Sequence, residues 1–460
     1  MKQNREEGQK QNLGTGSIGK LLAQLAIPAV VAQIVNLLYN IVDRIYIGHM
    51  PEVGADALTG VGLFMPILML VNAFAMMAGA GGAPRAAIAM GQGDRDRAEK
   101  IMANCFTVLL IFAAVLTGVF YVSAPALLRL FGASDVTLPY AISYARTYIL
   151  GSICVLVVMG MNPFITTQGF AKISMMTTVI GAVINIVLDP IFIFVLDMGV
   201  KGAALATVLS QAVGVLWILR FLTGEKSTLR LKVSNMKLQL PIIGPCLALG
   251  ISTFVMLSTE SLLSMSFTSS LAKYGGDLAV GAMTIITSVS QLVTMPLTGI
   301  CQGAQPIISF NYGAGNDERV KKTFRLELLI CAAYAITFWA FLMVIPTAFA
   351  SIFNNDPELV SYTGWAIRIY MAGIFAMGFQ LVCQQSFMAL GQAKVSLLLA
   401  CLRKIVLLIP LIFILPAFLE NKVFAVFLAE PVSDIVAATV TVTVFMLQFK
   451  KILANGPSKK

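Results

Sequence analysis

The chain has 460 residues, of which 58% are apolar and only 12% are charged, and its formal net charge is +10. Soluble domains carry about a quarter charged residues, so this composition excludes a water-soluble protein, a disordered chain and a secreted disulfide scaffold. The basic excess does not indicate a nucleic-acid partner, because the lysines and arginines fall in short tracts between apolar runs. The composition therefore predicts an integral protein of the lipid bilayer.

The apolar runs predict twelve membrane-spanning helices, since a span needs about 20 apolar residues and no stretch is left for a separate soluble domain. In chain order we expect the spans at residues 20–46, 60–88, 101–123, 139–162, 173–196, 200–221, 241–266, 278–300, 325–349, 362–388, 395–418 and 423–447. The predicted fold is an all-α polytopic membrane protein. An even number of spans places both termini on the same side of the membrane.

Basic residues distinguish the two sides of the membrane, because lysine and arginine collect in cytoplasmic loops. If the N-terminus is cytoplasmic, the inside segments hold the basic tracts at 2–20, 95–100, 220–237, 319–325 and 450–460. The outside segments hold only Arg129, Lys201, Lys273 and Lys422. We therefore expect a multi-pass protein of a bacterial-type cell membrane with both termini in the cytoplasm.

An internal repeat relates the two halves of the chain. A shift of 222 residues, without gaps, pairs Gly81 with Gly303, Gly93 with Gly315, Tyr148 with Tyr370, Gly151 with Gly373 and Gly169 with Gly391. Each half holds six predicted helices, so both halves enter the membrane in the same orientation, as in transporters that rock two lobes around a central site. We expect a cytoplasmic segment 1–19, an N-lobe 20–221, a cytoplasmic linker 222–240, a C-lobe 241–447 and a cytoplasmic tail 448–460. The alternative is a duplication that is only ancestral, as in some channels.

The first predicted helix carries a polar stripe. Its members lie at spacings of three, four and three residues, which places them on one face, and they are Gln33, Asn36, Asn40 and Asp43. Polar and ionisable groups inside a membrane are costly and are usually functional, so the stripe should line a cavity or another helix. Pro28 removes one backbone hydrogen bond and is expected to kink this helix. The alternative for Asp43 is a structural ion pair with Arg44.

The fifth predicted helix carries Asn185 and Asp189 one turn apart on the same face. Pro190 cannot donate to the carbonyl of Ile186, which leaves a free oxygen near this face. Thr207 on the sixth helix lies at a similar depth, by the rise of about 1.5 Å per residue. These oxygens are the hard ligands that a small cation prefers. The alternative is a hydrogen-bonded pair that only joins the first and fifth helices.

The repeat does not duplicate these acids, because the 222-residue shift places Asp43 on Met265 and Asp189 on Leu411. Acids with a purely structural role would be expected in both lobes. An acid pair that is present in the first lobe only therefore indicates an ion-coupling site in that lobe. Glu260 is the other deep carboxylate predicted, and it could attract a cationic substrate or take up a proton. Its alternative is a structural acid bonded to serine or threonine hydroxyls.

These residues resemble the multidrug and toxic compound extrusion (MATE) family over the whole chain. The resemblance rests on Pro28 and Asp43, the glycine turns at 91–93 and 313–315, the Gln168–Lys172 and Gly391–Lys394 loops, and the Asn185–Pro190 element. The segment Tyr39–Arg44 is similar to the MepA-like branch of the family. The resemblance implies two six-helix bundles that export cationic, amphipathic compounds by antiport with Na⁺ or H⁺.

The resemblance also implies the site residues. In the family the coupling cation is held by groups that map onto Asp43, Asn185, Asp189 and Thr207, which are the possible Na⁺ ligands here, and onto the backbone carbonyl of Ala203. We expect the substrate cavity to include Gln33, Asn36, Tyr39, Asn40, Glu260 and Gln291, and the helix kinks to lie at Pro28 and Pro190. The expected partners are small cationic or amphipathic drugs, with no cofactor, nucleotide or nucleic acid, and the expected state is a monomer.

Three other functions are alternatives to export. A lipid-linked saccharide flippase or metabolite exporter of a related superfamily would grip pyrophosphate with arginines in its cavity, but the in-span Arg146 and Arg368 lie near the outer ends. An enzyme needs a convergent nucleophile, base or metal set, and none is visible. A channel would not need buried titratable acids in only one lobe.

Overall fold

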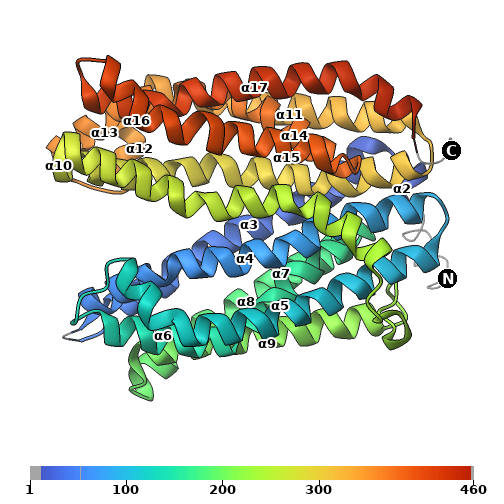
Figure 1. The fold of residues 1–460 in the computed structure, drawn as a ribbon, viewed down its shortest axis with the longest axis horizontal. Helices are drawn as coiled ribbons and strands as arrows, with labels where there is room; N and C mark the ends of the chain where they lie inside the picture. The colour runs from blue at the N-terminus through green and yellow to red at the C-terminus, as the bar shows by residue number, and fades with distance from the viewer. Residues whose placement is uncertain (1–11, 52, 457–460) are drawn as a thin grey trace. The chain divides into compact units, whose positions relative to one another are not determined.

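The computed structural model describes residues 12–51 and 53–456. The remaining parts of the predicted N-terminal segment and C-terminal tail, residues 1–11 and 457–460, lie outside the described residues. The regular elements of the described chain are all helical (Figure 1). Those of the first half are α2 (Asn12–Thr15), α3 (Ile18–Gly48), α4 (Gly54–Gly91), α5 (Arg95–Leu130), α6 (Leu138–Leu150), α7 (Ser152–Thr167), α8 (Ala171–Pro190), the π-helix η1 (Ile191–Val195), α9 (Gly199–Thr223) and the 3₁₀-helix η2 (Val233–Asn235).

The second half begins with α10 (Leu240–Gly313). Its further elements are α11 (Asp317–Val344), α12 (Pro346–Ser351), α13 (Pro357–Tyr370), the 3₁₀-helix η3 (Met371–Gly373), α14 (Ile374–Ala389), α15 (Ala393–Cys401), the π-helix η4 (Leu402–Leu408), α16 (Ile409–Phe418) and α17 (Lys422–Ala454).

The number of membrane crossings agrees with the sequence. Ten helical segments of the described chain are long and apolar enough to cross a membrane, and α6 with α7, bent by 56°, forms an eleventh crossing. The 74-residue α10 consists of two helices joined at Gly276, whose φ of 64° and ψ of −159° are not helical. The predicted all-α fold with twelve crossings is confirmed.

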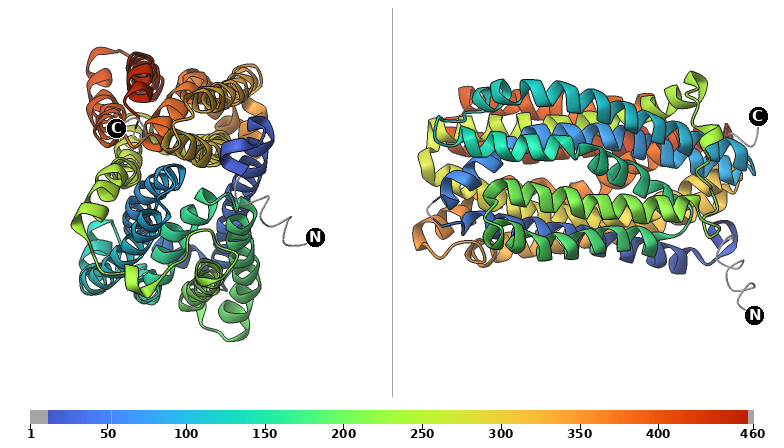
Figure 2. Two further views of the ribbon diagram at one scale, coloured as in Figure 1. Left: turned by 90° about the vertical axis from the view of Figure 1, so that its right-hand side faces the viewer. Right: turned by 90° about the horizontal axis from the view of Figure 1, so that it is seen from below.

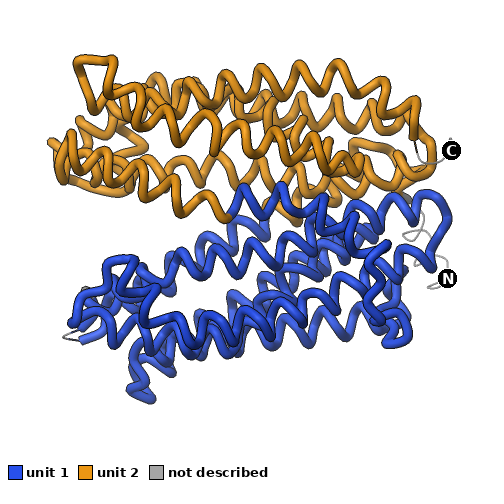
Figure 3. The backbone as a smooth tube through the Cα atoms, viewed as in Figure 1, with its two compact units in different colours: residues 1–12, 31–257 blue, residues 13–30, 258–460 orange. Residues whose placement is uncertain are grey.

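The chain forms two compact units, which Figure 3 shows in different colours. Among the described residues, unit 1 comprises residues 12, 31–51 and 53–257, and unit 2 comprises residues 13–30 and 258–456. Within each unit the helices run side by side as a bundle (Figure 2). The core of unit 1 lies where α4 packs against α5 and α7, around fully buried side chains such as Phe64, Met102 and Phe164.

The units differ from the predicted lobes because α3 and α10 are each divided between them. Residues 18–30 of α3 belong to unit 2, and residues 240–257 of α10 belong to unit 1. Glycines permit the close contacts that hold the beginning of α3 in unit 2 and the beginning of α10 in unit 1. A Cβ atom on Gly303 would lie 2.5 Å from Ala26 Cα in unit 2, and a Cβ atom on Gly250 would lie 1.8 Å from the Met77 carbonyl oxygen in unit 1.

The repeat is visible in the backbone of the turns. Gly93 and its repeat partner Gly315 have φ values of 81° and 74°, a region that strongly favours glycine. Gly151, at the break between α6 and α7, has its repeat partner at Gly373, between α13 and α14. Sequence reasoning predicted unbroken helices at 139–162 and 362–388 because an apolar run gives no sign of a bend.

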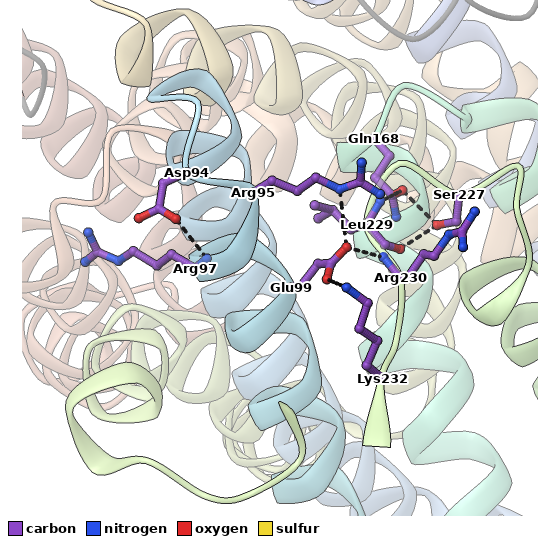
Figure 4. Close-up of polar contacts among 9 residues, drawn as sticks. All are labelled: Asp94, Arg95, Arg97, Glu99, Gln168, Ser227, Leu229, Arg230 and Lys232. Atoms are coloured by element: carbon purple, nitrogen blue, oxygen red, sulfur yellow. Dashed lines mark hydrogen bonds and ion pairs between the residues drawn. The ribbon is translucent and has the colours of Figure 1, made fainter. Parts of the chain in front are cut away.

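The linker between the repeats is bound to unit 1 by the buried carboxylate of Glu99 on α5 (Figure 4). Glu99 Oε2 accepts a hydrogen bond from Lys232 Nζ at 2.6 Å, and Glu99 Oε1 accepts one from the backbone N–H of Arg230 at 3.1 Å. The Nε of Arg95, one turn earlier on α5, lies 3.3 Å from the same Oε1 atom. The carboxylate therefore joins the linker to the beginning of α5.

Two amide side chains fix the linker at further points. Gln168 Oε1, at the end of α7, accepts hydrogen bonds from the Leu229 backbone N–H at 2.8 Å and from the Ser227 hydroxyl at 2.9 Å (Figure 4). Asn104 Oδ1, on α5, accepts from the Gln239 backbone N–H at 2.7 Å. The predicted linker is thus held along its length against one unit.

We expect Glu99→Gln to expose the linker to trypsin. The substitution keeps the side-chain shape but removes the charge that holds Lys232, and a charge-assisted hydrogen bond is stronger than a neutral one. A loss of about 1 kcal/mol in local stability would raise the open population, and with it the rate of cleavage after Arg230 and Lys232, about fivefold. The control is Glu318→Gln, which breaks the exposed ion pair with Lys322. Equal cleavage of the two variants would contradict the anchoring role.

We expect Gly250→Ala to lower the thermal unfolding midpoint of the purified protein in detergent. The added methyl group would meet the Met77 carbonyl oxygen, and overpacking of this kind costs about 1–3 kcal/mol. Gly118→Ala is the matched control, because a Cβ atom at Gly118 has no heavy atom within 4 Å. If both variants unfold at the same temperature as the wild type, the close packing of Gly250 against the Met77 carbonyl oxygen is contradicted.

Candidate functional site

Three helices of unit 1 bring the predicted cation ligands together. Asn185 Nδ2 on α8 donates to Asp189 Oδ1 at 3.2 Å and to Thr207 Oγ1 on α9 at 3.3 Å. The Thr207 hydroxyl in turn donates to the Ala203 backbone carbonyl at 3.1 Å. These side chains are almost completely inaccessible, and so is that of Asp43 on α3. We call Asp43, Asn185, Asp189, Ala203 and Thr207 the oxygen cluster.

Several oxygens of this cluster are buried without a hydrogen-bond donor. Within the described part of the chain, no donor reaches Asp43 Oδ1, Asn185 Oδ1 or Asp189 Oδ2. Such orphaned acceptors are costly in a dry interior unless a proton or cation joins them. Carboxylate, amide and hydroxyl oxygens are the ligands of hard cations such as Na⁺, so these residues fit a small alkali ion or a proton.

Asp43 lies against Asp189 and is not paired with its neighbour Arg44. The two carboxyl groups are close enough to share a hydrogen bond. The Arg44 guanidinium is instead directed to the sulfur of Met65, at 4.0 Å, and no ion pair between Arg44 and Asp43 is present among the described residues. Two adjacent carboxylates repel each other when both are ionised, which favours the uptake of one positive charge between them.

Pro28 and Pro190 lie at different places in their helices, α3 and α8. Pro28 lies inside α3, in the part of the helix that belongs to unit 2. Pro190 is the last residue of α8 and precedes the π-helix η1. Without an N–H group Pro190 cannot satisfy the carbonyl of Ile186, and π turns are frequent at functional sites.

Three tyrosines adjoin the oxygen cluster. Tyr39 and Tyr144 lie within electrostatic range of both acids of the cluster, and the Tyr144 and Tyr148 rings stack with centroids 6.0 Å apart. Sequence reasoning assigned Tyr39 to the substrate cavity but missed Tyr144 and Tyr148 as neighbours of the acids. The repeat pairing of Tyr148 with Tyr370 was a signal that could have drawn attention to one of them.

The other predicted cavity residues do not join the oxygen cluster. Asn40 donates to the backbone carbonyl of Asn36 at 2.6 Å, so this part of the stripe is bonded within α3. Gln33 is half-buried in unit 1, and Gln291 is exposed on α10 in unit 2. Their assignment to a substrate cavity stays a prediction.

Unit 2 contains a group of charges that sequence reasoning missed. Arg403 on η4 binds Asp434 Oδ1 on α17 through Nη2 at 2.7 Å, and its Nη2 lies 3.4 Å from Glu430 Oε1. Lys404, next on η4, forms an ion pair with Glu260 on α10. We call Glu260, Arg403, Lys404, Glu430 and Asp434 the ion network.

The ion network corrects two steps of the sequence reasoning. Glu260 was expected to bond to hydroxyl groups if it were structural, but Lys404 pairs with it. The in-span arginines were expected only near the outer ends, yet Arg403 lies within the predicted span 395–418 with its side chain 11% exposed. Arg403 and Lys404 lie inside that predicted span, and the sequence analysis did not identify them.

A comparison with protein families gives a match to one family model, MatE, in both repeats, at residues 28–191 and 252–414. Among curated proteins, the chain is 23% identical over 423 residues to the multidrug export protein MepA of Staphylococcus haemolyticus, covering 92% of each chain. It is 21% identical over 420 residues to MepA of Staphylococcus aureus, covering 91% of this chain and 92% of the relative.

Solved structures show the same fold. A crystal structure of MATE in complex with MaD3S has a TM-score of 0.88 and 25% identity, and the match covers 96% of this chain and 98% of the other. A MATE structure in the bent conformation has a TM-score of 0.90, with 24% identity and coverage of 98% and 99%. A transporter of the MOP superfamily from Pyrococcus furiosus, described as having a binding pocket of reverse polarity that suggests a different function, has a TM-score of 0.89, with 24% identity and coverage of 96% and 98%.

We expect Thr207→Val to destabilise the protein by about 1–3 kcal/mol, because the buried Asn185 amide loses an acceptor. The matched control is Thr439→Val, since the hydroxyl of Thr439 also donates to the carbonyl four residues earlier but is exposed. The thermal unfolding midpoint of each variant is measured in detergent. Equal midpoints for the two variants would show that the hydrogen bond between Asn185 and Thr207 does not contribute to stability.

Proposed function

The chain belongs to the MatE family, and on that premise we propose that it is a secondary active exporter of cationic, amphipathic compounds that works by antiport with Na⁺ or H⁺. Members of this family are transporters, so the chain is a membrane transporter and not an enzyme. The curated relatives named above are multidrug export proteins, and their name supports a range of small-molecule substrates. We further propose a monomer in the cell membrane with both termini in the cytoplasm.

The observation that carries the coupling proposal is the oxygen cluster of unit 1. Its two acids are buried, adjoin each other and keep unsatisfied oxygens. When both acids are ionised and no cation is bound, the transporter holds a cationic substrate. Na⁺ or H⁺ entering from outside reduces the negative charge of the pair and triggers release of the substrate.

Coupling requires that the ion bind the two conformations with different free energies. A charged carboxylate pair is far more costly in a dry environment than in a wet one, by several kcal/mol. Movement of the oxygen cluster between such environments would therefore make ion binding and conformation depend on each other. Thr207 and Ala203 supply neutral oxygens, which suit an alkali ion as well as a proton.

A flippase of lipid-linked saccharides is the alternative function. It needs arginines that are available to phosphate groups. The buried Arg403 is engaged by Asp434 and Glu430, so its charge is already matched inside unit 2. This arrangement favours export of cations over transfer of a pyrophosphate-linked lipid.

We expect Asp43→Asn and Asp189→Asn to slow the export of a fluorescent cation at least about tenfold, which corresponds to about 1.4 kcal/mol. An asparagine cannot gain or lose the charge on which coupling depends. The assay uses proteoliposomes with Na⁺ and pH gradients imposed separately. Asp135→Asn is the control, because Asp135 is an almost fully exposed acid.

Two results would overturn the proposal. If the Asp43 and Asp189 variants export at the rate of the wild type, the oxygen cluster does not couple transport to an ion. If export by the wild type follows neither gradient, antiport itself is wrong.

A further inference from the structure

We propose that Arg85 and Arg97, at the end of unit 1 that carries the linker, form a binding site for a phosphate group. Arg85 lies on α4 and Arg97 on α5, and both belong to unit 1. The inference goes beyond the proposed export function, because it concerns an anion and residues outside the oxygen cluster and the ion network. We call Arg85 and Arg97 the arginine pair.

Arg85 is a half-buried arginine in an apolar helix. It precedes Gly91, the last residue of α4, by about 9 Å at the rise of an α-helix. Its Nε atom is buried, and no acceptor among the described residues reaches it. The neighbouring Cys246 thiol on α10 donates to the Ile242 carbonyl at 3.3 Å, so it does not provide a counter-charge. A charged donor without an acceptor is costly away from water, and this guanidinium therefore favours an anion.

Arg97 supplies a second guanidinium, which lies within electrostatic range of Arg85. Its side chain is exposed near the beginning of α5 and is directed away from Glu99, on the opposite side from Arg95 (Figure 4). Asp94 accepts a hydrogen bond from the Arg97 backbone N–H at 3.0 Å. Over the described part of the chain, the guanidinium itself has no ion pair or hydrogen bond. Two positive charges at this place repel each other, and an anion between them removes that repulsion.

The second repeat shows what an arginine at the position of Arg97 binds when the protein supplies the acceptors. Its repeat partner Arg319 donates from Nε to Asn311 Oδ1 at 3.1 Å. Its Nη2 donates to the backbone carbonyls of Leu13 at 3.2 Å and of Gly16 at 2.8 Å. All of these residues belong to unit 2. Three oxygens of its own unit therefore satisfy Arg319.

Unit 1 does not supply the same acceptors. The 222-residue shift places Ala89 at the position of Asn311, so the amide oxygen is missing. It places Asn235 at the position of Leu13, and the carbonyl of Asn235 accepts from Asn104 Nδ2 at 3.2 Å. A phosphate group carries the oxygens that Arg97 does not find in its own unit.

The second guanidinium is specific to unit 1. The repeat partner of Arg85 is Ile307, which is a buried apolar residue. The fold therefore does not require a charge at this position. Guanidinium groups are typical of phosphate recognition, because each presents parallel N–H donors to the phosphate oxygens. A pair of them without an acid partner indicates a phosphate ligand.

The depth of the arginine pair fits a phosphate group at the membrane surface. Arg85 lies near the end of α4 and Arg97 near the beginning of α5, on the side that we propose to be cytoplasmic. Basic groups between membrane helices on this side bind the headgroups of anionic lipids, and soluble phosphate esters present the same group from the cytoplasm. A flippase would instead need arginines deeper in the spans.

The test measures binding to the full-length protein in a neutral detergent, by isothermal titration calorimetry at constant ionic strength. The ligands are inorganic phosphate and dihexanoyl phosphatidylglycerol, and dihexanoylglycerol is the comparison ligand without phosphate. We expect Arg85→Gln and Arg97→Gln to weaken binding of a phosphate ligand about tenfold or more, because each removes charge-assisted hydrogen bonds. Arg85→Lys keeps the charge but not the parallel donors, so it should bind more weakly than the wild type and more tightly than Arg85→Gln.

Arg325→Gln is the matched control, since Arg325 is an exposed arginine near the beginning of α11 in unit 2. It should bind as the wild type does. The exposed Arg97 keeps the proposal testable if the Arg85 variants do not fold. Tighter binding of the phospholipid than of inorganic phosphate identifies a lipid headgroup as the ligand, and equal binding identifies a soluble phosphate.

Three results would overturn the proposal. The wild type binds neither phosphate ligand, or it binds dihexanoylglycerol as tightly as the phospholipid. Alternatively, Arg97→Gln binds as the wild type does, or Arg325→Gln weakens binding by the same factor. None of these measurements uses an ion gradient, so their failure leaves antiport standing.

Discussion

The cost of leaving a polar or charged group unpaired in hydrocarbon governs this molecule. The backbone meets that constraint by forming helices, so the regular structure of the described chain is helical throughout. Charged side chains meet it by gathering into a few buried groups instead of scattering along the spans. The oxygen cluster and the ion network are two such groups. The oxygen cluster keeps buried oxygens that no donor reaches, so a proton or a cation would stabilise it.

The two repeats share their turns and helix breaks but not their charged residues. The turns at Gly93 and Gly315 have nearly the same backbone angles, and the helix breaks at Gly151 and Gly373 recur at the same offset. The charged residues do not recur, although they lie on corresponding helices of the two halves. Packing thus restrains the glycines in both copies, whereas the buried charged residues differ between the two copies.

The sequence predicted the helices and the oxygen cluster for a clear physical reason. Apolar runs of fixed length define spans, and Asn185 and Asp189 share a helix face in a pattern that stands out against apolar neighbours. The ion network could not be predicted in the same way, because its partners come from helices far apart in the chain. The π turn of η4, which holds both Arg403 and Lys404, also has no periodic signature. Helix breaks and the sharing of α3 and α10 depend on close contacts that a single sequence does not reveal.

The sharing of α3 and α10 has a consequence for biogenesis. The beginning of α3 packs against Gly303, a residue that the ribosome adds roughly 280 positions later. The first helix therefore enters the membrane long before its permanent neighbour exists, and it must wait there without completing its packing. The same exchange would arise in a dimer of identical halves in which each copy lends its first helix to the other. The halves of this chain are therefore expected to mature together and not one after the other.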